Sequence, residues 1–198
     1  MPRVAPVLLA LFLVVPAAHA SSVMAKYVAA VNGTTLKVHA QGKAMTVRMH
    51  GVATPDVNDP QPDLQRLGRE SQIYLAESLR NQWVYVEFPN GEPKADANGV
   101  IEAYIYVNRG AVATFLNEKL VTEGLAIVNR RVTTPYNEKL LAAEETARAS
   151  SRGMWGAFAS GTGKEIAAGS QRQTYIGELQ PSRNSYVSRW VSSYGGRY

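Results

Sequence analysis

Residues 34–41 alternate between two kinds of side chain, and this alternation constrains the fold more than any other feature of the chain. Thr34, Leu36, Val38 and Ala40 fall on one face of an extended segment, and polar or charged residues alternate with them. A period of two with one largely apolar face is typical of a half-buried β-strand. The sequence therefore predicts a strand in this segment.

Four further segments have strand character. Turn-forming residues at Asn32-Gly33 and Gln41-Gly42, and the loop 89–99, separate them. These predicted strands are 23–30, 45–52, 83–88 and 100–107. Together with the first segment they make five.

Helical spacing of apolar residues predicts about three helices: one between the third and fourth strands, one after the fifth strand, and one from about Pro135 to Arg152-Gly153. The residues expected to face inward are Ile73, Ala76 and Leu79 in the first, Val112, Phe115, Leu116 and Leu120 in the second, and Leu140, Ala143 and Ala147 in the third. This order predicts an α+β fold that is mainly β, a five-stranded barrel of the oligonucleotide/oligosaccharide-binding (OB) type.

The 198-residue chain contains no cysteine, which excludes a disulfide framework, a thiolate metal site and a thiol nucleophile. Its formal net charge of +5 is unevenly distributed. Residues 21–159 carry 15 basic and 14 acidic groups, whereas residues 160–198 carry 5 basic and 2 acidic groups. The nearly neutral central segment produces no strong field for phosphates, because non-specific affinity for nucleic acid comes chiefly from clustered Lys and Arg.

The first 20 residues have the pattern of a secretory signal peptide. Arg3 precedes an apolar run over residues 4–15, and the small-residue site Ala18-His19-Ala20 follows. The run is too short to span a membrane, which takes about 20 residues. We expect cleavage after Ala20 and a soluble protein that is periplasmic or secreted; the alternative is an uncleaved anchor or a helix of the domain. The predicted units are a signal peptide (1–20), a barrel domain (21–159) and a tail (160–198).

Four motifs occur in order between about residue 24 and residue 156. They are Arg48 with Gly51-Val52-Ala53-Thr54-Pro55-Asp56, then Gly68-Arg69-Glu70-Ser71, then Asp96-Ala97-Asn98-Gly99-Val100-Ile101-Glu102-Ala103-Tyr104, and finally Leu120-Val121-Thr122-Glu123-Gly124 with Gly153-Met154-Trp155. The first three resemble the segments Arg-x-x-Gly-Ile-Asp-Thr-Pro-Glu, Gly-x-Glu-Ala and Asp-x-Tyr-Gly-Arg-x-Leu-Ala-Tyr of the thermonuclease (staphylococcal-nuclease-like) family. The resemblance implies that family's barrel and its Ca²⁺-dependent cleavage of DNA and RNA phosphodiesters.

The resemblance places the family's two calcium-binding carboxylates on Thr34 and Ala53 of this chain. Calcium takes about 6–8 oxygen ligands, and hydroxyl, carbonyl and water oxygens do not replace two negative charges. We therefore expect no metal and no other cofactor at this site. The alternative is a metal site rebuilt from Asp59, Asp63 and Glu70.

The resemblance also implies two phosphate-binding arginines and one glutamate. Arg48 matches the first arginine, Val100 stands at the second, and Asp56 stands at the glutamate. Removing a single preplaced donor typically costs about 10²–10³ in rate. We therefore expect Arg48 and Asp56 to be vestigial catalytic residues and the chain to lack useful nuclease activity.

A ligand could still bind in the vestigial cleft. His50 lies two residues after Arg48 and shares its face in an alternating strand. We expect Arg48, His50 and Thr54 to be the ligand-binding residues. The alternative for His50 is an exposed polar side chain on a barrel strand.

The tail changes composition at Ser160, where a Ser/Gly-rich segment predicts a linker. Beyond it, Tyr186, Trp190 and Tyr194 recur every four residues with Arg189 between them, a spacing that fits one face of a helix and equally one face of a strand. We expect these four residues to bind a protein partner, because Trp, Tyr and Arg are enriched at protein interfaces. Stacking on nucleic acid and a disordered end are the alternatives.

These observations predict an exported, catalytically inactive nuclease-like binding or assembly module of the cell envelope. The first alternative is a weak or residual metal-dependent phosphodiesterase that acts on DNA or RNA through Arg48 and Asp56. The second alternative is a non-catalytic oligonucleotide binder.

Overall fold

The computed structural model describes residues 22–109, 112–159 and 186–195. The predicted signal peptide, 1–20, and the predicted linker that begins at Ser160 lie outside these residues. Within the described ranges, no helix is both long enough and apolar enough to cross a membrane.

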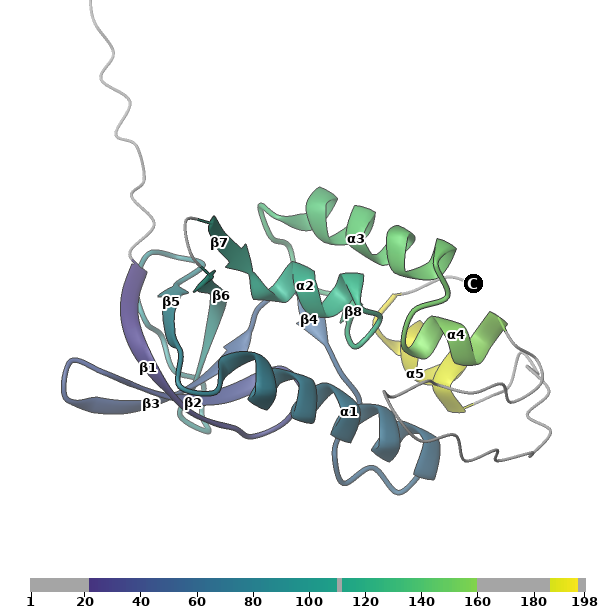
Figure 1. Cartoon of the computed structure of the whole chain (residues 1–198), viewed down its shortest axis with the longest axis horizontal. Coiled ribbons are helices and arrows are strands. Elements are labelled where there is room, and N and C mark those ends of the chain that lie inside the picture. Colours follow the sequence, from purple (N-terminus) through teal and green to yellow (C-terminus); the bar gives the residue numbers. More distant parts are fainter. Residues whose placement is uncertain (1–21, 110–111, 160–185, 196–198) are drawn as a thin grey trace, which may run out of the picture.

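Six strands form one sheet that closes on itself (Figure 1). In sheet order they are β3 (Lys43–Met49), β2 (Thr35–Ala40), β1 (Ser22–Ala30), β5 (Trp83–Glu87), β6 (Val100–Arg109) and β7 (Val112–Phe115). Neighbours in this order pair antiparallel, and β3 also pairs with β6 in parallel. The β3–β6 pairing closes β1, β2, β3, β5 and β6 into a mixed barrel, so the predicted five-stranded OB-like α+β fold is confirmed.

Two short strands form a second sheet that is separate from the barrel. The third predicted strand, 45–52, is divided in the structure: β3 ends at Met49, Gly51 adopts a positive φ of 80°, and β4 (Val52–Ala53) begins a new direction. β4 pairs with β8 (Ile127–Val128). This change of direction brings Ala53 away from the barrel wall and toward the helices.

The helices pack beside the barrel and on one another. They are α1 (Pro62–Leu79), α2 (Leu116–Thr122), α3 (Asn137–Ala149), α4 (Met154–Ala159) and α5 (Tyr186–Ser193). α1 begins at the end of the molecule where α4 and α5 lie and runs to the barrel (Figure 1). α5 contacts α1, although more than 20 residues separate α5 from α4 in the sequence.

The buried side chains form two clusters. The larger one fills the barrel and includes Leu36, Val38, Val47 and Tyr104. The smaller one lies between β4, β8 and the helices, and its buried members are Ala53, Leu67, Ile127, Ala147, Met154, Trp155 and Val191. This second cluster joins the C-terminal helix to the rest of the domain.

One residue predicted to face inward is wrong in each of the first two helices, whereas Leu79, Phe115, Leu116 and Leu120 are buried as predicted. Ile73 is 56% exposed, because α1 begins at Pro62 and turns Leu64, Leu67, Ser71 and Leu75 inward instead. Val112 is 70% exposed because residues 112–115 form β7 and the second helix starts only at Leu116. In both places the apolar spacing fits a helix, but tertiary pairing determines which residues are buried.

Candidate functional site

The loop between β1 and β2 is held in place by one side chain and one glycine. Asn32 Oδ1 accepts hydrogen bonds from the backbone N–H groups of Thr34 at 3.0 Å and Thr35 at 2.8 Å. Gly33 has no room for a side chain, since a Cβ there would lie 2.5 Å from Ser71 Cβ and 2.8 Å from Thr54 Oγ1. The loop is therefore pressed against Thr54 and helix α1.

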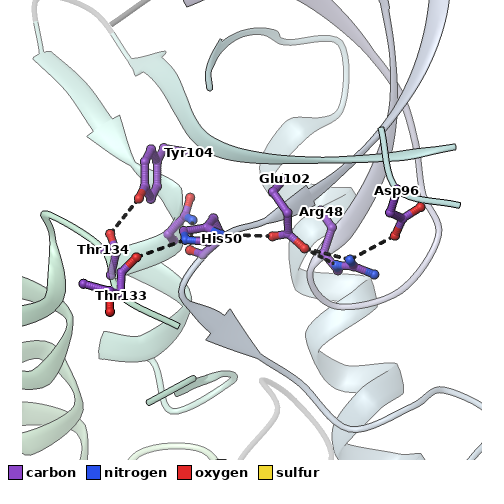
Figure 2. Close-up of polar contacts among 8 residues, drawn as sticks. Arg48, His50, Asp96, Glu102, Tyr104, Thr133 and Thr134 are labelled. Carbon is purple, nitrogen blue, oxygen red and sulfur yellow. Dashed lines mark hydrogen bonds and ion pairs between the residues drawn. The ribbon is translucent and has the colours of Figure 1, made fainter. Parts of the chain in front are cut away.

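The barrel closure places a carboxylate against Arg48. In the parallel pairing of β3 with β6, Arg48 is in register with Glu102. Arg48 Nε donates to Glu102 Oε1 at 2.7 Å, and Arg48 Nη2 lies 3.2 Å from Asp96 Oδ2 (Figure 2). Burial alone would lower the pKa of Arg48, but the hydrogen bonds and charges of Glu102 and Asp96 outweigh it and raise the pKa.

Asp96 is fixed mainly by its own turn. Its Oδ1 accepts hydrogen bonds from the backbone N–H groups of Asn98 at 2.9 Å and Val100 at 3.0 Å. The hydrogen bond from Val100 is the main cause of the lowered pKa of Asp96, and Arg48 adds to it. Asp96 thus stays ionised and holds the outer side of the arginine.

His50 lies on the other side of Glu102. His50 Nδ1 is 3.3 Å from Glu102 Oε2, and His50 Nε2 is 3.4 Å from the carbonyl oxygen of Thr133 (Figure 2). Because both partners only accept hydrogen bonds, both contacts are made together only when the imidazole is protonated. The hydrogen bond to Glu102 raises the pKa of His50 against the opposing effect of burial.

Glu102 is the shared partner in this group. Burial would raise the pKa of Glu102, but the hydrogen bonds from His50 and Arg48 and their positive charges lower it. When His50 is protonated, the two cations, Arg48 and His50, are balanced by the two carboxylates, Glu102 and Asp96. The group as a whole presents little net charge to a ligand.

These residues line a polar pocket of about 350 Å³. Arg48, His50 and Glu102 form one wall, the loop after β1 forms another, and the segment after β8 and the C-terminal segment complete it. The lining residues are Asn32, Thr34, Thr35, Arg48, Met49, His50, Gly51, Val52, Ala53, Thr54, Glu102, Asn129, Val132 and Tyr194. The three predicted ligand-binding residues, Arg48, His50 and Thr54, thus all lie in one pocket.

Comparison with known proteins places this fold and pocket in a family. The model of the staphylococcal nuclease homologue family matches residues 46–157, which is more than half of the chain. The chain belongs to the staphylococcal nuclease family. Within it, a thermonuclease of Staphylococcus hyicus is 30% identical over 131 residues, which cover 66% of this chain and 74% of the relative.

Two other relatives extend the comparison. Endonuclease YncB of Bacillus subtilis is 30% identical over 128 residues, covering 64% of this chain and 58% of the relative. An uncharacterised protein of Methanocaldococcus jannaschii, MJ1439, is 27% identical and covers 66% of this chain and 70% of the relative. The family resemblance read from the motifs is therefore confirmed.

The residues at the staphylococcal nuclease metal positions do not fit calcium. Thr34 is 6% exposed, and Ala53 is 7% exposed within the apolar second cluster. Glu102, which lines the pocket, and Asp96 are both paired with Arg48. No group of three or more His, Cys, Asp or Glu side chains that could hold a metal ion occurs among the residues that the structure describes.

The predicted catalytic residue Asp56 lies apart from the pocket walls. Its side chain accepts a hydrogen bond from the backbone N–H of Asn58 at 2.7 Å, and the residue is exposed. Asp56 is not among the residues that line the pocket, whereas Arg48 is. Of the two predicted catalytic residues, the structure therefore places only Arg48 in the pocket with the predicted ligand-binding residues.

Sequence reasoning missed Glu102, which pairs with both Arg48 and His50. A signal was present, because Glu102 stands where the family motif Asp-x-Tyr-Gly-Arg-x-Leu-Ala-Tyr has leucine. Its partner could not be read from the chain, since β3 and β6 become neighbours only through the closure of the barrel.

The predicted partner-binding residues lie in or next to helix α5 (Tyr186–Ser193). The spacing of Tyr186, Trp190 and Tyr194, which fitted a helix and a strand equally, corresponds to a helix. Trp190 and Tyr194 are partly buried against the chain's own second cluster, and Arg189 is exposed. The tail thus uses two of its predicted partner-binding residues within the molecule.

Proposed function

We propose that this chain is a staphylococcal nuclease homologue that keeps the barrel and a ligand pocket but does not hydrolyse phosphodiesters. It acts as a binding or assembly module. The observation that carries the proposal is the pairing of Arg48 with Glu102 and Asp96, at 2.7 and 3.2 Å.

An arginine that holds a scissile phosphate must offer its donors to the phosphate oxygens. In this chain Nε and Nη2 of Arg48 already donate to carboxylates of the protein. A phosphate that used these two donors would have to displace Glu102 or Asp96, and any phosphate at Arg48 would meet their negative charge. The arginine that matches the family is therefore held in an internal ion pair.

The residues at three other positions of the family's machinery support the same proposal. Thr34 and Ala53 supply no carboxylate for a cation, and Val100 supplies no hydrogen-bond donor for a transition state. Each missing group removes preorganised charge, and the losses act on the same step.

Export and a protein partner in the cell envelope are parts of this proposal. The signal-peptide pattern of residues 1–20 supports export to the periplasm or the medium. The Arg- and aromatic-containing composition of the tail supports a protein partner.

A hydrolysis assay tests the proposal. Purified chain is incubated with single-stranded DNA and with RNA in millimolar Ca²⁺, beside the thermonuclease of Staphylococcus hyicus as a positive control and Arg48→Ala as the matched variant. We expect no cleavage above the level of Arg48→Ala. Ca²⁺-dependent turnover that Arg48→Ala abolishes would restore the phosphodiesterase alternative.

A further inference from the structure

The outer face of the barrel carries large apolar side chains on two neighbouring strands. Seven large apolar side chains are exposed among the described residues, and four of them lie on β1 and β5. They are Met24 and Val28 on β1, 54% and 57% exposed, and Trp83 and Tyr85 on β5, 52% and 37% exposed. Single exposed apolar residues are normal, whereas a contiguous group marks a contact surface.

Strand pairing makes these side chains neighbours. In the antiparallel pairing of β1 with β5, Met24 is opposite Tyr85 and Lys26 is opposite Trp83. Side chains that are opposite each other have Cβ atoms about 4.5–5.5 Å apart, and diagonal neighbours lie about 7–8 Å apart. Met24, Trp83 and Tyr85 are therefore contiguous. Together with Lys26 and Val28 they are called the β1–β5 patch.

The patch faces solvent, because the residues that alternate with it fill the core. Ala25 and Val84 are completely buried. Helix α1 meets β1 at the other end of the strand, where the Gln72 side-chain amide donates hydrogen bonds to the carbonyl oxygens of Ala30 and Val31. In Figure 1, β1 and β5 lie on the side of the barrel away from α4 and α5. The patch shares no residue with the pocket.

The strands beside the patch carry positive charge. Residues 22–55, which include β1, β2 and β3, contain three lysines and one arginine but no Asp or Glu. Lys26 belongs to the patch, and exposed Lys37 and Lys43 lie on the next two strands of the sheet. On β5, the Glu87 carboxylate accepts a hydrogen bond from the Tyr136 hydroxyl at 3.0 Å. The nearly neutral domain thus has one face that is both basic and apolar.

This combination favours an anionic lipid surface over a macromolecule. Trp and Tyr rings suit the boundary between water and hydrocarbon, and lysine stems lie along apolar surface while their ammonium groups stay in water. The core of a protein interface is depleted in lysine, yet Lys26 stands opposite Trp83. Nucleic acid is bound through stacking rings and arginine, whereas Met24 and Val28 have no ring and β1, β2 and β5 contain no arginine. A second copy of the chain would bring its own lysines against these.

We propose that the β1–β5 patch docks this chain on the surface of a bilayer that contains anionic lipid. The apolar members of the patch enter the headgroup region, and Lys26, Lys37 and Lys43 meet the lipid phosphates. This inference goes beyond the proposed function, because the patch is separate from the pocket and neither ligand binding nor hydrolysis there enters into it.

Vesicle binding tests the proposal. The test uses residues 21–198, the chain expected after signal cleavage, since the apolar run over residues 4–15 would itself enter a bilayer. All described residues are retained. Co-sedimentation is measured with vesicles of phosphatidylcholine alone and with an equal mixture of phosphatidylcholine and phosphatidylglycerol. We expect binding to the mixed vesicles that weakens as salt is added, and much weaker binding to phosphatidylcholine alone.

Variants of the patch identify the contact. Lys26→Gln should weaken binding to the mixed vesicles about fivefold, the contribution expected of one lysine near an anionic surface. Trp83→Ser should weaken it about fivefold to tenfold, because a half-exposed ring can no longer be buried in the bilayer. Arg69→Gln and Ile73→Ser make the same kinds of change at exposed positions of α1, and neither should alter binding.

Tryptophan fluorescence gives a second readout at the patch itself. Trp83 is 52% exposed, whereas Trp155 is 4% exposed and Trp190 is partly buried. Vesicles that contain brominated phosphatidylcholine should therefore quench the emission of Trp83. Trp83→Phe keeps an apolar ring and should keep most of the binding, but it should lose most of the quenching.

Three results would overturn the proposal. The first is that the chain does not bind the mixed vesicles at low salt. The second is binding that Lys26→Gln and Trp83→Ser leave unchanged, because the membrane contact would then lie elsewhere in the chain. The third is tighter binding to single-stranded DNA or polyglutamate, or a dimer, that the same variants abolish, since the face would then serve a nucleic acid, an acidic protein or a second copy.

Thermal unfolding of each variant checks that it folds, and Trp83→Phe replaces Trp83→Ser if that variant does not. Vesicle binding needs neither calcium nor nucleic acid. Hydrolysis in the nuclease assay would therefore overturn the proposed function and leave this result unaffected.

Discussion

Arg48 and Glu102 face each other in the parallel pairing that closes the barrel, and Arg48 Nε donates to Glu102 Oε1 over 2.7 Å. The two side chains are 42% and 38% exposed. Water therefore screens part of their attraction, so the pair adds little to the stability of the fold, and its main effect is to place a negative charge on one donor of the arginine. Whether Arg48 can bind a phosphate thus depends on Glu102.

Because Glu102 contacts both Arg48 and His50, the pKa of His50 reports on the charge of Glu102. Glu102→Gln removes the negative charge whose hydrogen bond raises the pKa of His50. We expect the pKa of His50 in this variant to fall toward its ordinary value of about 6.5, measured by NMR titration of the imidazole protons. Glu118→Gln removes a carboxylate that pairs with Lys139 instead and serves as the control. An unchanged pKa of His50 in Glu102→Gln would contradict the contact in Figure 2.

The same group predicts how stability depends on pH. The folded chain binds the His50 proton more tightly than the unfolded chain, because the pKa of His50 is raised on folding. The resulting stabilisation is fully present below about pH 6.5 and is lost as the pH rises through the pKa of the folded state. The stability advantage of the natural chain over His50→Gln, from urea unfolding, should therefore shrink as the pH rises above about 6.5. In a Glu102→Gln background most of this pH dependence should disappear; a dependence that persists there would assign it to another group.

Removing the internal carboxylates should release Arg48 for phosphate binding. Glu102→Gln and Asp96→Asn each leave the arginine in place but remove a negative charge beside it. We expect each variant to bind short single-stranded DNA more tightly than the natural chain, with a salt dependence steeper by about 0.7 in logarithmic slope for each phosphate gained. Fluorescence anisotropy at several salt concentrations measures both quantities. Adding Arg48→Ala to either variant should cancel the gain, and a gain that survives Arg48→Ala would place the phosphate elsewhere.

Restoring a carboxylate at position 53 should destabilise the chain. Ala53 is 7% exposed and packs in the cluster that contains Val191. Ala53→Asp should lower the free energy of unfolding by about 1–3 kcal/mol, the usual cost of burying a polar group without partners in a protein. Ala44→Asp, the same change at an exposed position of β3, is the matched control. Equal costs at the two positions would show that position 53 is open to water.

Much of the barrel could be predicted from the sequence because strands leave a local signal. The alternation of Leu36 and Val38 with Lys37 and His39 survives in β2, where the first pair is buried and the second exposed. Helix faces were less predictable. Ile73 has the spacing of a core residue, yet α1 packs through a different face, which carries Leu67, Ser71 and Leu75.

The candidate site could be predicted only where a single residue determines a chemical role. Thr34, Ala53 and Val100 identify missing groups from the sequence alone, because each motif position fixes one chemical role. The contacts of Glu102 with Arg48 and His50, and the burial of Val191 in the same cluster as Ala53, depend on which distant segments become neighbours. Neither the hydrophobic periodicity nor a motif within one segment predicts which distant segment it will contact.

The most direct test of the central claim is a crystal structure of the chain grown in millimolar Ca²⁺. We predict no ordered cation beside Thr34 and Ala53, with Arg48 still paired with Glu102. A well-ordered cation coordinated at Thr34 and the backbone of Ala53 or Thr54 would contradict this claim and would favour calcium-dependent hydrolysis instead.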